Sequence, residues 1–172
     1  MIQRAVLAAL ICLSLAAPAQ SVDYEVAFSP RGKSLELVLS TIHSAKKSIR
    51  VAAYSFMSKP IAAALADACK RGVDVKVVAD RAGNSDRYTT VTYLANQGVP
   101  VRLNGQYAIM HHKFMLIDGI HLQTGNFTYS ADAGNKNAEN VLVLRDVPVM
   151  VEQYEREWER LWEESFDVKA SY

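Results

Sequence analysis

Hydrophobic and polar positions follow two different periods along the chain, and segments of the two kinds alternate. Residues 22–28 alternate with period two, which is typical of a half-buried strand. Residues 34–46 place their apolar side chains on one stripe and predict an amphipathic helix. Further strands are predicted at 48–56, 73–80, 99–103, 113–118, 120–124 and 140–144, and further helices between Pro60 and Gly72, at 86–96 and at 151–162.

The order of these elements predicts an α/β fold, in which helices flank both faces of one sheet. The sheet is expected to be mixed, because Asp118-Gly119 joins strands 113–118 and 120–124 and favours a hairpin turn. The 172 residues, 50% hydrophobic and 22% charged, have the composition of an ordinary globular domain. We expect one domain without an internal repeat.

The first 19 residues differ from the rest of the chain. Arg4 precedes an apolar run over residues 5–16, and residues 17–19 (Ala-Pro-Ala) are a typical cleavage site. This layout predicts a secretory signal peptide, with an apolar run too short to cross a bilayer. We expect cleavage of residues 1–19, a single domain over residues 20–172, a periplasmic or secreted protein and no stable membrane insertion. An uncleaved N-terminal anchor is the alternative.

The charge balance excludes a broad electrostatic attraction for polyanions. Loss of Arg4 from the 19 basic residues leaves 18, against 18 acidic ones. A nucleic acid would therefore have to be held locally. Cys69 is the one cysteine left after cleavage, so no internal disulfide can form, and its helical spacing from Ile61 and Leu65 favours a buried thiol.

Candidate chemistry gathers in the region that begins at His111. Because residues two apart on a strand share a face, His111 and Lys113 should point together while His112 points away. A neutral imidazole can attack the phosphorus of a phosphodiester while an adjacent ammonium neutralises the non-bridging oxygens. The other ring nitrogen of such a nucleophile needs an acceptor, for which Glu139 is a candidate.

Other interpretations stay open for these side chains. His111 and His112 could be hairpin residues or could bind a metal with His121. Asp118 could be only the first residue of the Asp-Gly turn, and Glu139 could be a solvated acid at a strand edge. A metal-dependent hydrolase is disfavoured, because the sequence has neither an H-E-x-x-H motif nor a carboxylate cluster, and lysine is a poor ligand.

The motif H-x-K-x4-D over residues 111–118, followed by the Gly-polar-x-polar loop over residues 125–128, resembles the phospholipase D superfamily. The similarity extends through nearly the whole chain after residue 19 and includes residues 54–56, 71–76 and 136–140. It is greatest to the small, secreted, single-motif bacterial endonucleases of that superfamily. The resemblance implies a phospholipase D-like sandwich.

The resemblance also implies a role for each residue of the motif. His111 would become a transient phosphohistidine, Lys113 would bind phosphate and Glu139 would orient the histidine. Asp118 belongs to the motif and is a candidate catalytic residue, although its place in an Asp-Gly dipeptide favours a turn residue.

The loop after the second hairpin strand supplies the remaining phosphate-binding candidates. Gly125 would permit close backbone approach, and the side chains of Asn126 and Thr128 would donate hydrogen bonds to phosphate. The family usually has Gly-Ser-x-Asn where this chain has Gly-Asn-x-Thr. The exchange keeps one amide and one hydroxyl but changes their order.

The implied function is phosphodiester cleavage in nucleic acid, DNA or RNA, with little sequence preference and without a metal or other cofactor. Superfamily members with two motifs build one site from two histidines, one that attacks and one that protonates the leaving oxygen. This chain has one motif, so the resemblance implies a homodimer in which both copies of His111 share a site. Two alternatives stay open: a lipid-cleaving phospholipase D and a non-catalytic nucleic-acid-binding protein.

Overall fold

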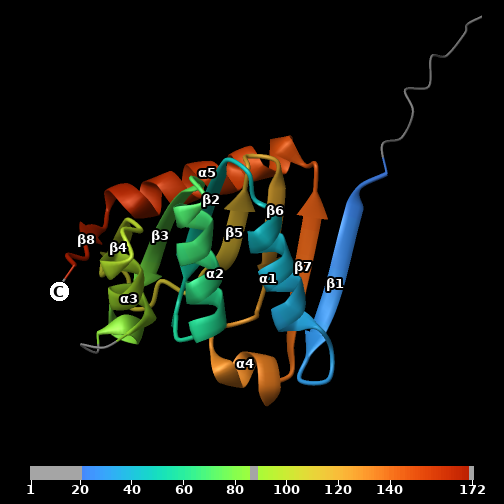
Figure 1. The fold of residues 1–172 in the computed structure, drawn as a ribbon, viewed down its shortest axis with the longest axis horizontal. Helices are drawn as coiled ribbons and strands as arrows, with labels where there is room; N and C mark the ends of the chain where they lie inside the picture. Colours follow the sequence, from blue (N-terminus) through green and yellow to red (C-terminus); the bar gives the residue numbers. More distant parts are fainter. Residues whose placement is uncertain (1–20, 86–88, 171–172) are drawn as a thin grey trace, which may run out of the picture.

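The computed structural model describes residues 21–85 and 89–170, within which eight strands form one sheet (Figure 1). The strands lie in the order β1-β7-β6-β5-β2-β3-β4-β8. Their bounds are β1 Asp23–Ser29, β2 Ser48–Ala53, β3 Asp74–Asp80, β4 Val101–Asn104, β5 Lys113–Ile117, β6 His121–Gly125, β7 Glu139–Arg145 and β8 Phe166–Asp167. The helices are α1 Ser34–Ser44, α2 Lys59–Lys70, α3 Thr90–Asn96, α4 Ala131–Asn135 and α5 Pro148–Glu163, with a 3-10 turn η1 at Ala82–Asn84.

The sheet is mixed, as the sequence predicts. β2, β3 and β4 run parallel, whereas the other neighbouring strands are antiparallel. β5 and β6 form the predicted hairpin, with Ile117 opposite His121. Asp118 and Gly119 join them with φ angles of 56° and 72°, the left-handed conformation to which an Asp-Gly turn is suited.

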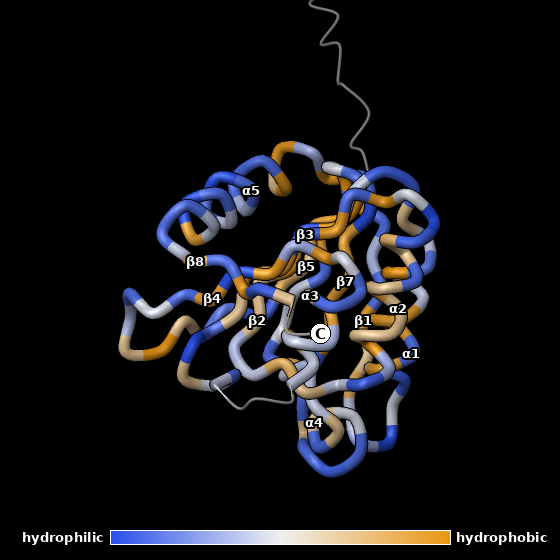
Figure 2. The backbone as a smooth tube through the Cα atoms, turned by 60° about the vertical axis from the view of Figure 1, so that its left-hand side comes forward, coloured by the Kyte–Doolittle hydropathy of each residue, from blue (hydrophilic) through white to orange (hydrophobic). Residues whose placement is uncertain are grey.

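Helices cover both faces of the sheet. The apolar stripes of α1, α2 and α3 pack on one face, in a core that includes Val51 and Met115. α5 lies across the other face, where Trp158 shares a second core with Phe114 and Leu116. Figure 2 shows the hydrophobic strand positions between these two layers. The predicted α/β class, with helices on both faces, is confirmed.

The structure differs from the sequence pattern mainly in short elements. α4 has only five residues and contains Gly134, so it shows no helical period, and the hydroxyl of Ser130 caps it by accepting from the N–H of Ala133 at 3.2 Å. The two-residue strand β8 and the turn η1 are also too short to predict from periodicity.

Further predictions differ from the structure in detail or lie outside the residues that it describes. α3 begins at Thr90 instead of 86, and residues 86–88 lie outside the described residues. The segment expected to be cleaved, residues 1–19, also lies outside them. Cys69 packs against the core but is half-buried, where the pattern favoured burial. Among the described residues no helix has the length and apolar character needed to span a membrane.

Four strand ends meet at one edge of the sheet, and this edge positions the candidate site. β2 ends at Ala53 opposite Lys113, where β5 begins. β6 ends at Gly125 opposite Val141, two residues after Glu139 begins β7. In Figure 1 this is the lower edge, beside α4.

Candidate active site

His111 and Lys113 lie together where β5 begins. Nζ of Lys113 is 3.4 Å from Nδ1 and 3.3 Å from Nε2 of His111, and it donates to the carbonyl oxygen of His111 at 3.0 Å. Met115, two residues further along β5, belongs to the core beneath α1–α3, so Lys113 lies on that face of the sheet. The predicted pairing of the imidazole and the ammonium is therefore confirmed.

The neighbouring histidines point elsewhere. His112 lies against α5, where its Nε2 is 3.1 Å from Oε1 of Glu157. His121 is at the opposite edge of the sheet, and its Nδ1 accepts from the N–H of Asp146. Within residues 21–85 and 89–170, no three histidine, cysteine, aspartate or glutamate side chains are grouped to hold a metal ion. His111 is thus not part of a histidine cluster.

Tyr54, just after β2, forms an aromatic wall beside the pair. Its ring centroid lies 4.9 Å from that of His111, with the ring planes at 59°. Nζ of Lys113 lies 5.9 Å from the same centroid. No pattern in the sequence gives Tyr54 a role, and the one signal for it is the similarity of residues 54–56 to the family.

Glu139 lies on the same face as Lys113, because Val141 and Val143 further along β7 belong to the core beneath α1–α3. Partial burial lowers the pKa of Lys113, and the negative charge of Glu139 opposes that shift without cancelling it. The carboxylate of Glu139 accepts from the N–H of Thr128 at 2.6 Å and from Nδ2 of Asn137 at 2.8 Å. These contacts hold the 125–128 loop against β7.

The loop over residues 125–128 lies next to Glu139, and its glycine also has a structural purpose. Gly125 has a φ of 142°, and a Cβ there would collide with the carbonyl oxygen of Asn140 on β7. A glycine is therefore required here by strand packing, and its approach to phosphate stays a prediction. Oδ1 of Asn126 accepts from the N–H of Asn140 at 2.7 Å, and Asn126 is exposed. A cleft of about 450 Å³ here is lined by Phe28, Ser29, Asn126, Ala138, Glu139 and Asn140.

Asp118 is the motif residue that the structure does not bring to His111, because the whole of β5 separates them. Its carboxylate accepts from the backbone N–H groups of Lys46, Lys47 and Ser48 at 2.7–3.1 Å. Desolvation alone would raise the pKa of Asp118, but these donors outweigh it and hold the pKa below its ordinary value. The geometry supports the turn interpretation rather than a catalytic role.

The sandwich, the paired His111 and Lys113 and the nearby Glu139 define a domain of the phospholipase D type. Residues 38–162 match the family described as "Cardiolipin synthase, PLD-like domain". This chain belongs to the phospholipase D superfamily.

Three relatives are each similar to most of this chain. A solved structure of Nuc from Salmonella typhimurium, titled a phospholipase D family member, superimposes with a TM-score of 0.85 and 39% identity, covering 87% of this chain and 100% of Nuc. Mitochondrial cardiolipin hydrolase from Xenopus laevis is 34% identical over 74% of this chain. Phospholipase D from Rickettsia bellii is 32% identical over 76% of this chain. The match spans only 60% and 65% of the lengths of these last two proteins.

Proposed function

We propose that this chain is a secreted nuclease that cleaves phosphodiester bonds through a covalent phosphohistidine on His111, without a metal cofactor. The observation that carries the proposal is the contact between the Lys113 ammonium and the His111 ring, 3.3 Å from Nε2, on the face that also holds Glu139. The resemblance to small bacterial endonucleases supports nucleic acid as the substrate, as does the 39% identity to the whole of Nuc.

The proposed reaction has two displacements at phosphorus. In the first, a ring nitrogen of His111 forms a bond to phosphorus, and the bond to the leaving oxygen breaks as that oxygen takes a proton from a second imidazole. In the second, water attacks phosphorus after giving a proton to that second imidazole, and the nitrogen–phosphorus bond breaks. Lys113 binds the non-bridging oxygens throughout, and Asn126 and Thr128 donate to phosphate from the neighbouring loop.

The second imidazole is proposed to be His111 of another copy in a two-fold homodimer. Large apolar side chains that are exposed around the site support a contact with another protein surface there. Phe28, Met57 and Ile109 are 62%, 52% and 52% exposed. Phe28 lies near the end of β1, Met57 follows β2, and Ile109 comes two residues before His111. The three side chains therefore surround the strand ends that carry the site.

A lipid phosphodiesterase is the second candidate function. The named activities of two relatives, cardiolipin hydrolase and phospholipase D, favour it. A mostly apolar hollow of about 500 Å³ lies between α2 and α3, and it could receive part of an acyl chain. Its lining residues are Met57, Lys59, Ala62, Ala63, Thr89, Thr90 and Tyr93.

The test is plasmid nicking by residues 20–172 in excess EDTA, beside release of a head group from phospholipid vesicles. We expect nicking by the parent protein and none by His111→Ala, with the parent rate retained by His43→Ala, which removes an exposed histidine. Cleavage that requires an added divalent metal would refute the phosphohistidine proposal. Head-group release without nicking would favour the lipid function, and DNA binding without turnover would favour a non-catalytic protein.

A further inference from the structure

Two buried polar side chains lie where β3 ends, next to the segment that carries His111. Asp80 is 2% exposed and Asn84 is 4% exposed. Oδ1 of Asp80 accepts from the N–H of Met110 at 2.8 Å, and Oδ2 accepts from the N–H of Gly83 at 2.7 Å. Asp80 is therefore bonded to the residue directly before His111.

Asn84 connects the same position to the other side of the His111 ring. Its Nδ2 donates to the carbonyl oxygens of Tyr54 at 2.7 Å and Asp80 at 2.8 Å, and its Oδ1 accepts from the N–H of Phe56 at 2.9 Å. Tyr54 is the aromatic wall whose ring lies 4.9 Å from that of His111. Asp80 and Asn84 thus fix the backbone on both sides of the imidazole.

Burial of the Asp80 carboxylate is not explained by a gain in folding stability alone. No lysine, arginine or histidine forms an ion pair with Asp80 among the described residues. Burial of an anion without a cation is unfavourable unless hydrogen bonds compensate for the lost water, and here two backbone N–H groups do so. What this arrangement provides is a fixed direction for the peptide group that leads into His111.

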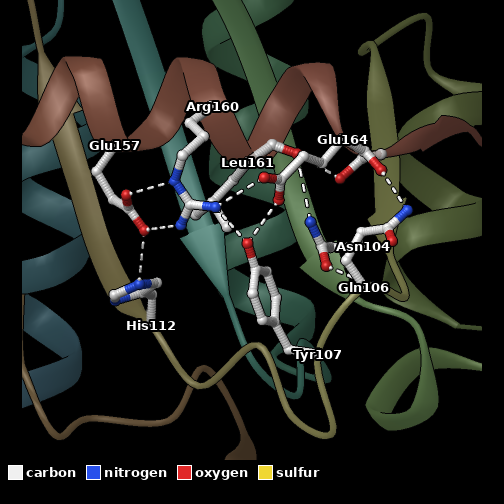
Figure 3. Close-up of polar contacts among 9 residues, drawn as sticks. Asn104, Gln106, Tyr107, His112, Glu157, Arg160, Leu161 and Glu164 are labelled. Carbon is white, nitrogen blue, oxygen red and sulfur yellow. Dashed lines mark hydrogen bonds and ion pairs between the residues drawn. The ribbon is translucent and has the colours of Figure 1, made fainter.

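The outer side of the loop over residues 105–112 is held by α5 (Figure 3). The hydroxyl of Tyr107 donates to Oε2 of Glu164 at 2.7 Å and accepts from the Arg160 guanidinium. Arg160 also binds Glu157, which contacts His112. Tyr107, His112 and Arg160 are exposed and the two glutamates are half-buried, and ion pairs at the surface contribute little to stability individually. The buried bond from Met110 to Asp80 is therefore the stronger restraint on the catalytic end of the loop.

We infer that Asp80 is a positioning residue for His111 and that Asn84 assists it through Tyr54. This inference rests on the proposed role of His111 as the nucleophile. In Asp80→Asn the side chain keeps its size, but its amide has one acceptor oxygen and one donor nitrogen. One of the N–H groups of Met110 and Gly83 must then face a donor. Whichever bond is lost, the side chain at position 80 no longer holds Met110 and Gly83 through the two oxygens of one fixed carboxylate, so the peptide before His111 shifts and the His111 ring moves with it.

The test compares Asp80→Asn with Leu65→Ala, which removes a fully buried side chain of α2. Leu65→Ala controls for lost stability, because it leaves every bond to the 105–112 loop intact. Hydrolysis of bis(p-nitrophenyl) phosphate and of plasmid DNA would be measured well below both melting temperatures. A displacement of the nucleophile by about 1 Å predicts a fall in kcat of about 100-fold in Asp80→Asn. KM should change little, and Leu65→Ala should keep the parent kcat.

A second measurement does not depend on activity. The ring ¹H–¹⁵N signals of His111, assigned by their loss in His111→Ala, should shift in Asp80→Asn and stay in place in Leu65→Ala. Unmoved ring signals, or a kcat equal to that of Leu65→Ala, would overturn the inference. If the parent hydrolyses neither substrate, the proposed function fails, and the ring signals still decide whether Asp80 positions His111.

Discussion

Replacement of Asp118 distinguishes a turn residue from a catalytic one. The Asp118 carboxylate accepts hydrogen bonds from the backbone N–H groups of Lys46, Lys47 and Ser48. Asp118 lies at the end of β5 that is far from His111. We expect Asp118→Ala to lower the free energy of unfolding and to leave kcat unchanged at a temperature where the variant is folded.

The expected loss of stability has two sources. Removal of the ionised acceptor costs about 2 kcal/mol of folding stability. Most of this cost comes from the N–H of Ser48, which is partly buried and loses its partner, because the exposed N–H groups of Lys46 and Lys47 can bind water instead. An alanine at the φ of 56° adds about 1 kcal/mol, because a side chain without a hydrogen-bonding group is disfavoured there. A total of about 3 kcal/mol lowers the melting temperature of a domain of this size by about 6–12 °C.

Asp118→Asn is the matched control, because asparagine before glycine tolerates the left-handed turn and keeps one acceptor oxygen. It should lose about 1 kcal/mol of stability. The pKa of Asp118 is lower in the folded protein than its ordinary value of 3.8. Its ionisation therefore stabilises the fold above that value, and this contribution disappears as the pH falls through the lower folded pKa.

The assay is thermal unfolding at several pH values beside kcat at 25 °C. The difference in melting temperature between parent and Asp118→Asn should narrow as the pH falls below about 4. A variant that unfolds at the parent temperature but has lost most of its kcat would refute the turn interpretation and return Asp118 to the catalytic residues.

Three further outcomes are expected. Because burial lowers the pKa of Lys113, kcat/KM should fall as the pH rises through a value below 10.5, and Lys113→Arg should move that alkaline limb upward in a pH–rate profile. Trp158→Phe removes a buried donor to the carbonyl oxygen of Val51 at 2.9 Å, which should cost about 2 kcal/mol by urea unfolding. Ile109→Ser should abolish the proposed dimer in light scattering together with cleavage, whereas Val149→Ser, also exposed but at the start of α5, should change neither.

The parts of the site that could be predicted are those that depend on residues close together in the sequence. Alternation along a strand is enough to separate His112 from His111 and Lys113, and the bonds of His112 to α5 agree with it. The Asp118-Gly119 hairpin could also be predicted, since the required left-handed turn has a local signature.

Contacts between distant segments could not be predicted in the same way. The bond from Asp80 to Met110 crosses 30 positions of the chain, and no period relates them. Gly125 is a phosphate-binding candidate by sequence, but the sequence does not indicate its close neighbour in the fold, the carbonyl oxygen of Asn140 on β7. That neighbour depends on the antiparallel pairing of β6 with β7, which becomes known only with the strand order.

The positions of the histidines explain why one chain does not supply the whole proposed mechanism. The sequence has four histidines, and a two-step displacement uses two imidazoles at one phosphate. His112 is turned to α5, His121 binds the Asp146 N–H at the opposite edge, and His43 lies near the end of α1. α1 ends just before Lys46, which bonds Asp118, so His43 also belongs to the edge away from His111. No second histidine side chain among the described residues lies beside that of His111, so the proposed mechanism takes its second imidazole from another copy of the chain, as the proposed dimer provides.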